Sequence, residues 1–520
     1  MKTSFLDGLT VLVLGLGDSG LAMARWCARC GAAEVRVWDS RAQPPQAEAL
    51  RATLPSAPML GGALDAEGAL DGVQLVLKSP GLSPRDGRIA PLLARAAQAG
   101  IAVQGELDLF VRALAELKAG RGYAPELLAI TGTNGKTTTT AMTARLVERA
   151  GRSVAVAGNI GPSMLTTLGQ ALDAADGLPE VWVLELSSFQ LDNVRDFEPS
   201  AAALLNLTQD HLDWHGSMDA YAGAKMRIFG RDAVLVVNRD DAQVAALVET
   251  LLAAPAARPG KAARPRKAAP RHVVRFGLDA PRSAGDFGLV TENGMAWLVR
   301  AHDLEEAPRK RRGDVPAEEL QLQRLMPADA LRLRGRHNAA NALAALALAG
   351  AIGCALAPML HALREYAGEP HRLEHVASVH GIDFFDDSKG TNVGASVAAI
   401  DGLGAERAAS KLVVLLGGDG KGQDFTPLAG PLARHARAVA TLGRDAAQIE
   451  MVLGDAGVPI GRHASLEAAT RWAYAQARPG DAVLLSPACA SLDMFRNYGH
   501  RAEVFVAEVR AIALEQGEVA

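Results

Sequence analysis

A short apolar run that ends in a glycine-rich turn constrains this chain more than any other feature. The segment Leu127–Thr140 reads LLAITGTNGKTTTT, so an apolar stretch passes through a turn into a helical pattern. Strand, turn and helix N-terminus in that order form a phosphate-binding loop, because glycines let backbone N–H groups approach an anion. Ile130 stands where the full Walker pattern has its first glycine, but the lysine and hydroxyl for phosphates and Mg²⁺ are present. We predict a nucleotide triphosphate site here; the alternative is a chance glycine turn before a helix.

Bulk composition narrows the class of protein. The 520 residues suggest about three domains. Only 4% of the residues are aromatic and the net charge is −4, which argues against a nucleic-acid partner. No apolar run reaches the ~18 residues of a membrane span, and no signal-peptide pattern opens the chain. We therefore expect a cytoplasmic protein with no membrane partner.

The four cysteines, Cys27, Cys30, Cys354 and Cys489, form no disulfide framework. Cys27 and Cys30 have the spacing of a metal or redox pair, but no second pair accompanies them. Both fall in an amphipathic helical pattern, so we interpret them as core residues.

Apolar runs alternate with helical patterns along the chain, which is the rhythm of βαβ units with parallel sheets. Helices are expected at Ser19–Cys30 and, buried, at Asn338–Ile352. Strands are expected at Thr10–Leu14, Glu34–Trp38, Val73–Leu77, Val154–Ala157, Val181–Leu186, Ala201–Asn206, Ala233–Asn238, Ile382–Asp386, Lys411–Leu416, Ala438–Leu442 and Ala482–Ser486.

These patterns predict an α/β protein of three consecutive domains with mainly parallel sheets. We place the domains at residues 1–118, 124–366 and 367–520, joined by linkers near 119–123 and 366–370.

The central domain contains two basic insertions, near residues 252–272 and 303–316. Residues 258–275 hold seven Lys or Arg and no acid, and a second basic cluster follows at Arg309–Arg312. Such composition disfavours a packed core, so we interpret both segments as solvated insertions; a nucleic-acid-binding tail is the alternative.

A second glycine-rich turn, Gly15–Gly20, has the G-x-G-x-x-G spacing between a strand and a helix, and Asp39 ends the next strand. Alone, this is typical of a dinucleotide site in a Rossmann-like domain, with Asp39 on a ribose hydroxyl. The same geometry holds any diphosphate at a helix N-terminus, including that of a nucleotide sugar.

Candidate catalytic residues follow the strands of the central domain. Glu185 closes an apolar strand, so its carboxylate should face the phosphate loop and suit Mg²⁺, with a surface acid as the alternative. The D-H-L-D segment at 210–213 brings an imidazole and carboxylates to the same sheet edge. Lys225 lies among small residues. Its side chain is either a desolvated nucleophilic amine or an ordinary surface lysine, and the sequence does not decide between the two.

Three strand ends of the third domain carry lysines, hydroxyls and glycines. They read DDSKGTN at 386–392, GGDGK at 417–421 and SPACAS at 486–491. Because the carboxyl ends of parallel strands meet at one sheet edge, the three loops suit an anionic substrate with carboxylates.

Together these motifs resemble those of the Mur ligases, ATP-dependent amide-forming enzymes of peptidoglycan synthesis. The resemblance covers nearly the whole chain and rests on GTNGKTT at 132–138, GNIG at 158–161, LELSSFQL at 184–191, DHLD at 210–213, RHNAANALAALALA at 336–349, EPHRLE at 369–374, DDSKGTN at 386–392, GGDGK at 417–421 and SPACASLDMF at 486–495. The last three favour the D-glutamate-adding members, and the lack of a D-N-P-R signature disfavours those that add meso-diaminopimelate.

The resemblance implies a Rossmann-like first domain, a P-loop ATPase-like central domain and a Rossmann-like third domain. It implies that ATP drives the addition of D-glutamate to UDP-N-acetylmuramoyl-L-alanine through an acyl phosphate. The implied cofactors are ATP, two Mg²⁺ ions and a CO₂-derived carbamate on Lys225. The product would serve cell-wall biogenesis, and through it cell shape, cell division and the cell cycle. We expect small-molecule partners only, and a monomer.

The resemblance also assigns residues. Catalysis is expected from Lys136, Glu185, His211 and Lys225, and metal ligation from Thr137, Glu185, His211 and the Lys225 carbamate. ATP is expected at Gly132, Thr133, Asn134, Gly135, Lys136, Thr137, Thr138, Asn341, Arg372 and Asp387. The uridine diphosphate substrate is expected at Ser19, Asp39, Arg41 and Asn159. D-Glutamate is expected at Lys389, Thr391, Lys421, Ser491, Leu492 and Tyr498.

Three alternative functions compete with this interpretation. A different Mur-type or folylpolyglutamate-type ligase would use the same chemistry on another amino acid. A nicotinamide-dependent oxidoreductase led by Gly15–Gly20 leaves the phosphate loop, Glu185 and the third domain unexplained. An ATP-driven switch protein needs no amino-acid pocket, and the third-domain lysines argue against it.

Overall fold

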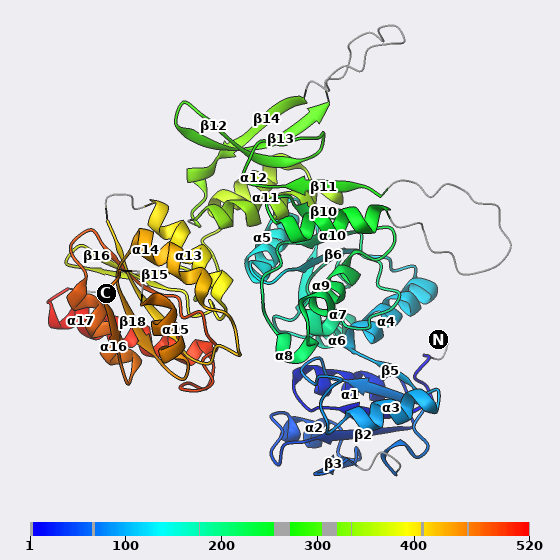
Figure 1. Cartoon of the computed structure of the whole chain (residues 1–520). Coiled ribbons are helices and arrows are strands. Elements are labelled where there is room, and N and C mark those ends of the chain that lie inside the picture. Colours follow the sequence, from blue (N-terminus) through cyan, green and yellow to red (C-terminus); the bar gives the residue numbers. More distant parts are fainter. Residues whose placement is uncertain are drawn as a thin grey trace, which may run out of the picture.

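The chain folds into three sheets that follow one another along the sequence (Figure 1). The computed structural model describes residues 4–64, 68–175, 177–253, 271–303, 320–333, 335–406, 410–454 and 457–518. Most neighbouring strands run parallel, with helices between them. The predicted α/β class with mainly parallel sheets is confirmed.

The first sheet is parallel throughout, in the order β3-β2-β1-β4-β5. Its strands are β1 (Thr10–Leu14), β2 (Glu34–Asp39), β3 (Met59–Gly61), β4 (Leu75–Lys78) and β5 (Ala102–Gln104). The helices are α1 (Asp18–Arg29), α2 (Ala47–Thr53), α3 (Ala90–Gln98) and α4 (Glu106–Arg121), with a 3₁₀ turn at Gly68–Leu70. The strand order reverses between β1 and β4, so the G-x-G-x-x-G turn after β1 opens at a position where such sheets bind ligands.

The second sheet has the order β14-β13-β12-β11-β10-β9-β6-β8-β7. Its strands are β6 (Glu126–Thr131), β7 (Val154–Gly158), β8 (Val181–Glu185), β9 (Ala201–Leu204), β10 (Val234–Asn238), β11 (Val273–Phe276), β12 (Phe287–Glu292), β13 (Met295–Asp303) and β14 (Leu320–Pro327). The helices are α5 (Lys136–Arg149), α6 (Met164–Asp173), α7 (Ser188–Leu191), α8 (Leu212–His215), α9 (Met218–Met226), α10 (Ala242–Ala253), α11 (Arg336–Ala351) and α12 (Leu356–Glu365), with 3₁₀ turns at Arg227–Phe229 and Ala328–Ala330.

Strands β12 to β14 form an antiparallel extension of this sheet that the sequence analysis did not predict. Their residues are half-exposed, so they lack the fully apolar run that identifies a buried parallel strand. The buried helix predicted at Asn338–Ile352 is confirmed as α11. It is apolar on every side because it packs against the strands β9 to β12 and against α5 and α12.

The third sheet has the order β15-β16-β20-β17-β18-β19, with only β15 antiparallel to its neighbour. Its strands are β15 (Glu374–Val379), β16 (Ile382–Asp386), β17 (Leu412–Gly417), β18 (Ala436–Leu442), β19 (Ile460–Arg462) and β20 (Ala482–Leu485). The helices are α13 (Val393–Glu406), α14 (Ala429–His435), α15 (Ala446–Leu453), α16 (Leu466–Gln476) and α17 (Tyr498–Glu515), with a 3₁₀ turn at Thr426–Leu428. The four strands predicted in this region are confirmed.

The connecting segments differ from the expectation in one place. The linker expected at 119–123 is helical through Arg121, because α4 continues until Gly122 adopts a φ of 69° and ends it. The segment 366–370 has neither helix nor strand, as expected. The structure describes only the ends of the two predicted insertions. Helix α10 extends into the first as far as Ala253, and strand β13 reaches Asp303 at the start of the second. The rest of both insertions, apart from residues 271 and 272, lies outside the described residues.

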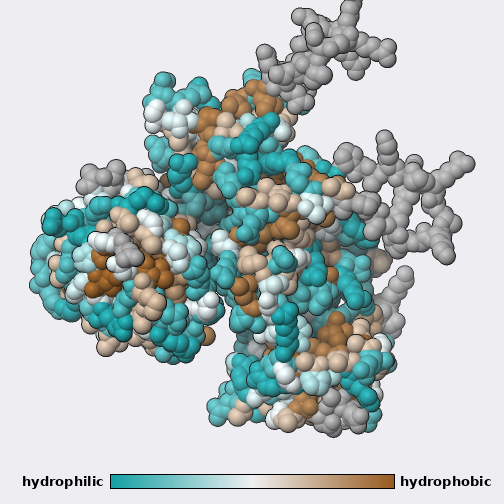
Figure 2. Space-filling view, in the orientation of Figure 1, coloured by the Kyte–Doolittle hydropathy of each residue, from teal (hydrophilic) through white to brown (hydrophobic). Residues whose placement is uncertain are grey.

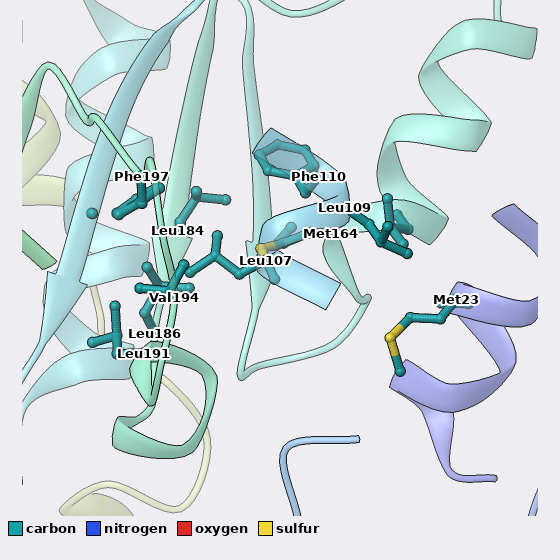
Figure 3. Close-up of a cluster of buried hydrophobic side chains, with 14 of the residues drawn as sticks. Met23, Leu107, Leu109, Phe110, Met164, Leu184, Leu186, Leu191, Val194 and Phe197 are labelled. Carbon is teal, nitrogen blue, oxygen red and sulfur yellow. The ribbon is translucent and has the colours of Figure 1, made fainter. Parts of the chain in front are cut away.

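Helix α4 joins the first sheet to the second through one apolar core. Leu107 and Phe110 of α4 gather with Met23 of α1 and Met164 of α6 in a single buried cluster (Figure 3). The Phe110 ring meets Trp182 of β8 edge-on, with ring centroids 5.0 Å apart. A core shared in this way fixes the first two domains relative to each other.

The face of the molecule shown in Figure 2 is mixed in hydropathy, and Cys27 of the Cys27–Cys30 pair is buried. On this face, apolar residues form small patches among hydrophilic ones. Among the helices that the structure describes, none has both the length and the apolar character that crossing a bilayer requires. Cys27 is buried, and burial raises the pKa of its thiol to about 12. A thiol in that state is unreactive, so its interpretation as a core residue is confirmed.

Replacing Phe110 by alanine should destabilise the first two domains, because it empties a buried aromatic site at their shared core. We expect a loss of about 3–5 kcal/mol in the free energy of unfolding. Urea denaturation followed by circular dichroism measures it, with the exposed Arg121→Ala as the control. A loss below about 1 kcal/mol would contradict the packing described for the shared core.

Candidate active site

The phosphate loop between β6 and α5 has the geometry that its sequence predicts. Gly135 adopts a φ of 81°, and a Cβ there would lie 2.5 Å from the Asn341 Oδ1. Any other residue would therefore be both strained and blocked. Backbone N–H groups at the start of α5 are left to bind an anion.

An asparagine pair fixes the shape of this loop. The Asn134 N–H donates to the Asn206 Oδ1 over 2.8 Å, and the Asn206 side-chain amide donates back to the Asn134 carbonyl over 3.0 Å. The Asn134 side chain in turn accepts a hydrogen bond from Asn392 of the third domain over 2.9 Å. The loop thus contacts the third domain directly.

Lys136 begins α5 and folds back over the loop. Its Nζ donates to the carbonyls of Gly132 and Thr133 over 2.9 and 2.7 Å. Burial lowers the pKa of this amine, while the charges of Glu185 and Asp210 raise it. The amine is thus held beside the loop, where a phosphate chain would lie.

Glu185 lies at the end of β8, as predicted, and is only 1% exposed. Its Oε1 accepts a hydrogen bond from the Asn159 side chain over 2.8 Å. Its Oε2 is buried without a partner among the described residues. An unpaired buried carboxylate oxygen is costly, so this atom suits a cation that arrives with a ligand.

The D-H-L-D segment places His211 in the same cavity as Glu185. His211 adopts a φ of 53°, an uncommon conformation for a non-glycine residue, and its Nε2 lies 3.5 Å from the Asp210 Oδ2. Burial lowers the pKa of His211, while the Asp210 charge raises it. A neutral imidazole is the form that ligates metals.

Lys225 is buried in α9 with 2% exposure, so the surface-lysine alternative is wrong. Its Nζ donates to the Gly132 carbonyl over 2.8 Å and to the Thr131 hydroxyl over 3.2 Å. Burial lowers the pKa of this amine well below its usual value, and the Lys136 charge lowers it further. The structure therefore favours a neutral, nucleophilic amine.

A cavity of about 480 Å³ lies between the central and third domains. It is lined by most of the residues predicted for ATP and metal binding, namely Thr133, Asn134, Gly135, Lys136, Thr137, Thr138, Glu185, His211, Asn341, Arg372 and Asp387. Asn159, predicted for the uridine diphosphate substrate, and Lys389 and Thr391, predicted for D-glutamate, line it too. Arg372 crosses the boundary, since its Nη2 donates to the Thr137 hydroxyl over 2.8 Å. Lys225 and Gly132 lie behind the loop rather than in the cavity wall.

Asp387 is the buried acid of the third domain in this cavity. Its carboxylate accepts a hydrogen bond from the Ser486 hydroxyl over 2.7 Å. Burial raises its pKa to about 7. This carboxyl group is therefore partly protonated near neutral pH.

The other residues predicted for the amino acid are not part of the cavity lining. Lys421, Ser491, Leu492 and Tyr498 do not line the 480 Å³ cavity, and Leu492 is 72% exposed. Tyr498 nevertheless contacts one residue that lines this cavity, because the Lys389 Nζ lies 3.9 Å from the centre of its ring.

Sequence reasoning missed Arg501, a buried residue of α17 that holds two of the third-domain loops together. Its guanidinium donates to the Ser388 carbonyl over 2.8 Å and to the Cys489 carbonyl over 3.2 Å. No local pattern marks it, because the sequence alone does not tell a buried arginine in a helix from a surface one.

A second cavity, of about 770 Å³, lies between the first and central domains. Ser19, Asp39, Arg41 and Asn159, the residues predicted for the uridine diphosphate substrate, all line it. Asn159 lines both cavities. Since Asn159 also donates to Glu185, the two cavities adjoin at this residue.

Asp39 holds the glycine-rich turn in place. Its Oδ2 accepts from the Leu16 N–H over 2.7 Å, and Arg41 donates to both of its oxygens over 2.9 and 2.7 Å. Burial alone would raise the pKa of Asp39, but the hydrogen bonds from Arg41 and the backbone outweigh it and lower the pKa to about 2. The Asp39 Oδ1 also accepts a hydrogen bond from the Arg41 N–H. The Asp39 carboxylate therefore stays ionised.

Comparison with known proteins decides the family. Residues 9–105 match the family model described as "Mur ligase MurD-like, N-terminal domain", residues 130–349 match "Mur ligase middle domain", and residues 371–489 match "Mur ligase, glutamate ligase domain". A protein of Burkholderia mallei, named UDP-N-acetylmuramoylalanine--D-glutamate ligase, is 57% identical over 514 residues, 98% of each chain. The chain belongs to the Mur ligase family.

A further relative and two solved structures are also similar to this Mur ligase. A protein of the same printed name from Albidiferax ferrireducens is 57% identical over 508 residues, covering 98% of this chain and 97% of that protein. Two solved structures share the fold. They are a UDP-N-acetylmuramate-alanine ligase of Thermotoga maritima (TM-score 0.55, 20% identity, 97% and 100% of the two chains) and a MurF ligase of the same organism in complex with ADP (TM-score 0.55, 16% identity, 98% and 96%).

The Asp39 interactions predict a pH-dependent contribution to the stability of this Mur ligase. Because its pKa falls from 3.8 to about 2 in the folded protein, its stabilisation is present above pH about 4 and is lost as the pH falls through about 2. Asp39→Asn should therefore cost about 1–3 kcal/mol at pH 7 and progressively less between pH about 4 and about 2.

Urea unfolding at several pH values measures this difference between wild type and variant. Asp18→Asn, at the exposed start of α1, is the control substitution. A difference that does not change between pH 7 and pH 2 would contradict the assignment of a lowered pKa to Asp39.

Proposed function

We propose that this Mur ligase uses ATP to join D-glutamate to UDP-N-acetylmuramoyl-L-alanine in peptidoglycan synthesis. The observation that carries the proposal is the meeting of the two cavities at Asn159, beside the phosphate loop and Glu185. A long nucleotide-sugar substrate in one cavity delivers its terminal carboxylate to a triphosphate in the other. The activity named for the 57% identical relatives supports the same reaction.

ATP would occupy the 480 Å³ cavity. Its phosphates would meet the N–H groups of residues 135–138 and the Lys136 amine, as at other helix N-termini that bind anions. Asn341, Arg372 and Asp387 would contact the rest of the nucleotide, since they line the same cavity from α11 and the third domain.

The residues around Glu185 fit divalent cations. The Thr137 hydroxyl and the unpaired Glu185 Oε2 would hold one Mg²⁺, and His211 with a carbamate on Lys225 would hold a second. Bound there, Mg²⁺ would neutralise charge on the transferred phosphoryl group. A neutral Lys225 amine would add to CO₂ and lose a proton to solvent, which gives a carbamate anion; the burial and lowered pKa of the amine support that modification.

The reaction would proceed in two steps. The L-alanyl carboxylate oxygen attacks the γ-phosphorus of ATP, the bond to ADP breaks, and an acyl phosphate forms. The D-glutamate amine then attacks the acyl carbon, loses its proton, and inorganic phosphate leaves. Phosphate is a far better leaving group than oxide, and Lys136 stabilises the transferred charge from its place beside the loop.

D-Glutamate would lie at the edge of the third domain. Lys389 and Thr391 line the cavity, and Lys421, Ser491, Leu492 and Tyr498 would complete the site. Ammonium and hydroxyl groups there would bind the two carboxylates of the amino acid. We also propose that the enzyme acts as a monomer in the cytoplasm.

A phosphate-release assay tests the proposal. Purified enzyme with ATP, Mg²⁺ and UDP-N-acetylmuramoyl-L-alanine should release phosphate with D-glutamate and much less with L-lysine, meso-diaminopimelate or L-alanine. Equal phosphate release without an amino acid, or a clear preference for one of the other three, would refute it. The second result would point instead to another ligase of the same family.

Lys136→Ala should abolish ADP formation, because the loop lysine neutralises charge that develops as the phosphoryl group moves. We expect kcat to fall at least about 10³-fold, within the range of lost charge-stabilising groups. A coupled ADP assay measures it, and the exposed Lys118→Ala is the control. Turnover within tenfold of wild type would rule out the assigned role.

Lys225→Ala should be inactive and should recover part of its activity when a short carboxylate such as acetate or propionate is added. The added anion would replace the carbamate in the cavity left by the side chain. The same ADP assay reads both results, and Lys136→Ala with the same carboxylates is the control that should not recover. Wild-type activity without any addition would exclude a carbamate requirement.

A further inference from the structure

The first turn of α13 packs directly against the phosphate loop of the central domain. A Cβ on Gly394, the second residue of α13, would lie 2.8 Å from the Thr208 Oγ1 and 3.1 Å from the Asn134 Nδ2. Both distances are shorter than an ordinary van der Waals contact, so a larger residue would push α13 away from the loop. Glycine at this position therefore lets two domains meet backbone to side chain.

A hydrogen bond crosses the domain boundary at the same point. Asn392 directly precedes α13 and is 5% exposed, and its side-chain amide donates to the Asn134 Oδ1 over 2.9 Å. The backbone of Asn134 is held from the other side by Asn206 of the central domain. The backbone and the side chain of Asn134 are thus fixed by different domains.

The N–H group of Ala395 decides which way the Asn392 amide faces. It donates to the Asn392 Oδ1 over 2.9 Å, so Asn392 caps the N-terminus of α13. A backbone N–H can only donate, so the Asn392 oxygen must face Ala395 and its NH₂ group must face Asn134. Asn134 must then present its own oxygen to Asn392. Neither amide can be turned over without setting two donors or two acceptors against each other.

This arrangement leaves the Asn134 Nδ2 as a donor for a ligand. Among the described residues, Asn134 forms side-chain hydrogen bonds with Asn392 alone, and its Nδ2 takes no part in them. The Nδ2 lies next to Gly394, and both residues line the cavity of about 480 Å³. An amide NH₂ group at this place can donate to a phosphate oxygen. The oxygen and the nitrogen of Asn392 are both engaged, so its effect on a nucleotide passes through Asn134.

We propose that Asn392 is a positioning residue for ATP, which turns the Asn134 amide so that its NH₂ group faces the phosphates. This inference rests on the proposed function, because it needs a nucleotide triphosphate in the smaller cavity. It gives the docking of the third domain a direct consequence for the phosphate loop, since the amide is oriented only while α13 lies against it.

Asn392→Ser tests the proposal, because serine also caps a helix N-terminus but is too short to reach Asn134. The KM for ATP, and the Kd of a non-hydrolysable ATP analogue measured by calorimetry, should rise about fivefold as the preorganised donor is lost. The values of kcat and of KM for UDP-N-acetylmuramoyl-L-alanine and D-glutamate should stay within about twofold. The reverse exchange at the N-cap of α16, Ser465→Asn, is the matched control and should change none of these values.

Gly394→Ala tests the close approach by itself. The added Cβ should move α13 away from the loop and raise the same KM and Kd about fivefold, because the hydrogen bond from Asn392 is then lost. Gly430→Ala in α14 is the control in the same domain, since its Cβ would meet only the Arg434 Nη1, at 3.4 Å.

A double-mutant cycle with Asn134→Ala separates positioning from a direct contact of Asn392 with ATP. In that background, Asn392→Ser should raise the KM for ATP by less than about twofold, because the amide that it turns is gone. An unchanged KM and Kd in Asn392→Ser or in Gly394→Ala, or additive effects in the double variant, would overturn the proposal. The Gly394 variant decides the matter if Asn392→Ser does not fold. A wild-type enzyme that binds the ATP analogue but releases no phosphate with the named substrates would end the proposed reaction instead, while the calorimetry still tests Asn392.

Discussion

Two lysines and two acids packed beneath one phosphate loop are the arrangement on which the rest of the site depends. The charges of Glu185 and Asp210 raise the pKa of the Lys136 and Lys225 amines and so partly offset the lowering that burial causes. Removing charges from water is costly unless opposite charges or hydrogen bonds compensate. Here loop carbonyls accept from both amines. Among the described residues, one carboxylate oxygen of Glu185 has no partner, so this atom suits a cation.

The loop that covers this group is tightly constrained by neighbouring backbone and side chains. Gly135 leaves no space for a Cβ against Asn341, and Asn134 is paired with Asn206. The anion-binding N–H groups are therefore set before any ligand arrives. Such preorganisation is what makes charge stabilisation effective in catalysis.

The two domain boundaries differ in kind. The first and central domains share an apolar core around Phe110 and Trp182. The third domain meets the phosphate loop through polar contacts, Asn392 with Asn134 and Arg372 with Thr137. Polar contacts exchange readily with water and ligand, whereas a shared core does not. Ligand-driven closure is therefore favoured at the third domain, where it would exclude water from the acyl phosphate.

Local patterns predicted the elements that carry the site, because a buried parallel strand must be apolar along its length. The run before Gly132 and the run that ends at Glu185 became β6 and β8, with both loops at the same sheet edge. The same rule failed for β12 to β14, whose half-exposed residues carry no such run. The sequence does not tell whether Lys225 is buried or exposed for a related reason. The burial of a side chain depends on distant segments and not only on its immediate neighbours in the chain.

The sequence by itself determined the class of fold, the phosphate loop, and which residue types gather at the ends of the strands, since these depend on periodicity and on backbone freedom within a few residues. Only the tertiary structure decided that Lys225 is desolvated, that Arg501 ties two loops together, and that Asn392 meets Asn134 of the phosphate loop. Each of these facts arises from contacts between segments far apart in the chain. No local pattern encodes such contacts, because the free energy of a buried charge is set by everything packed around it.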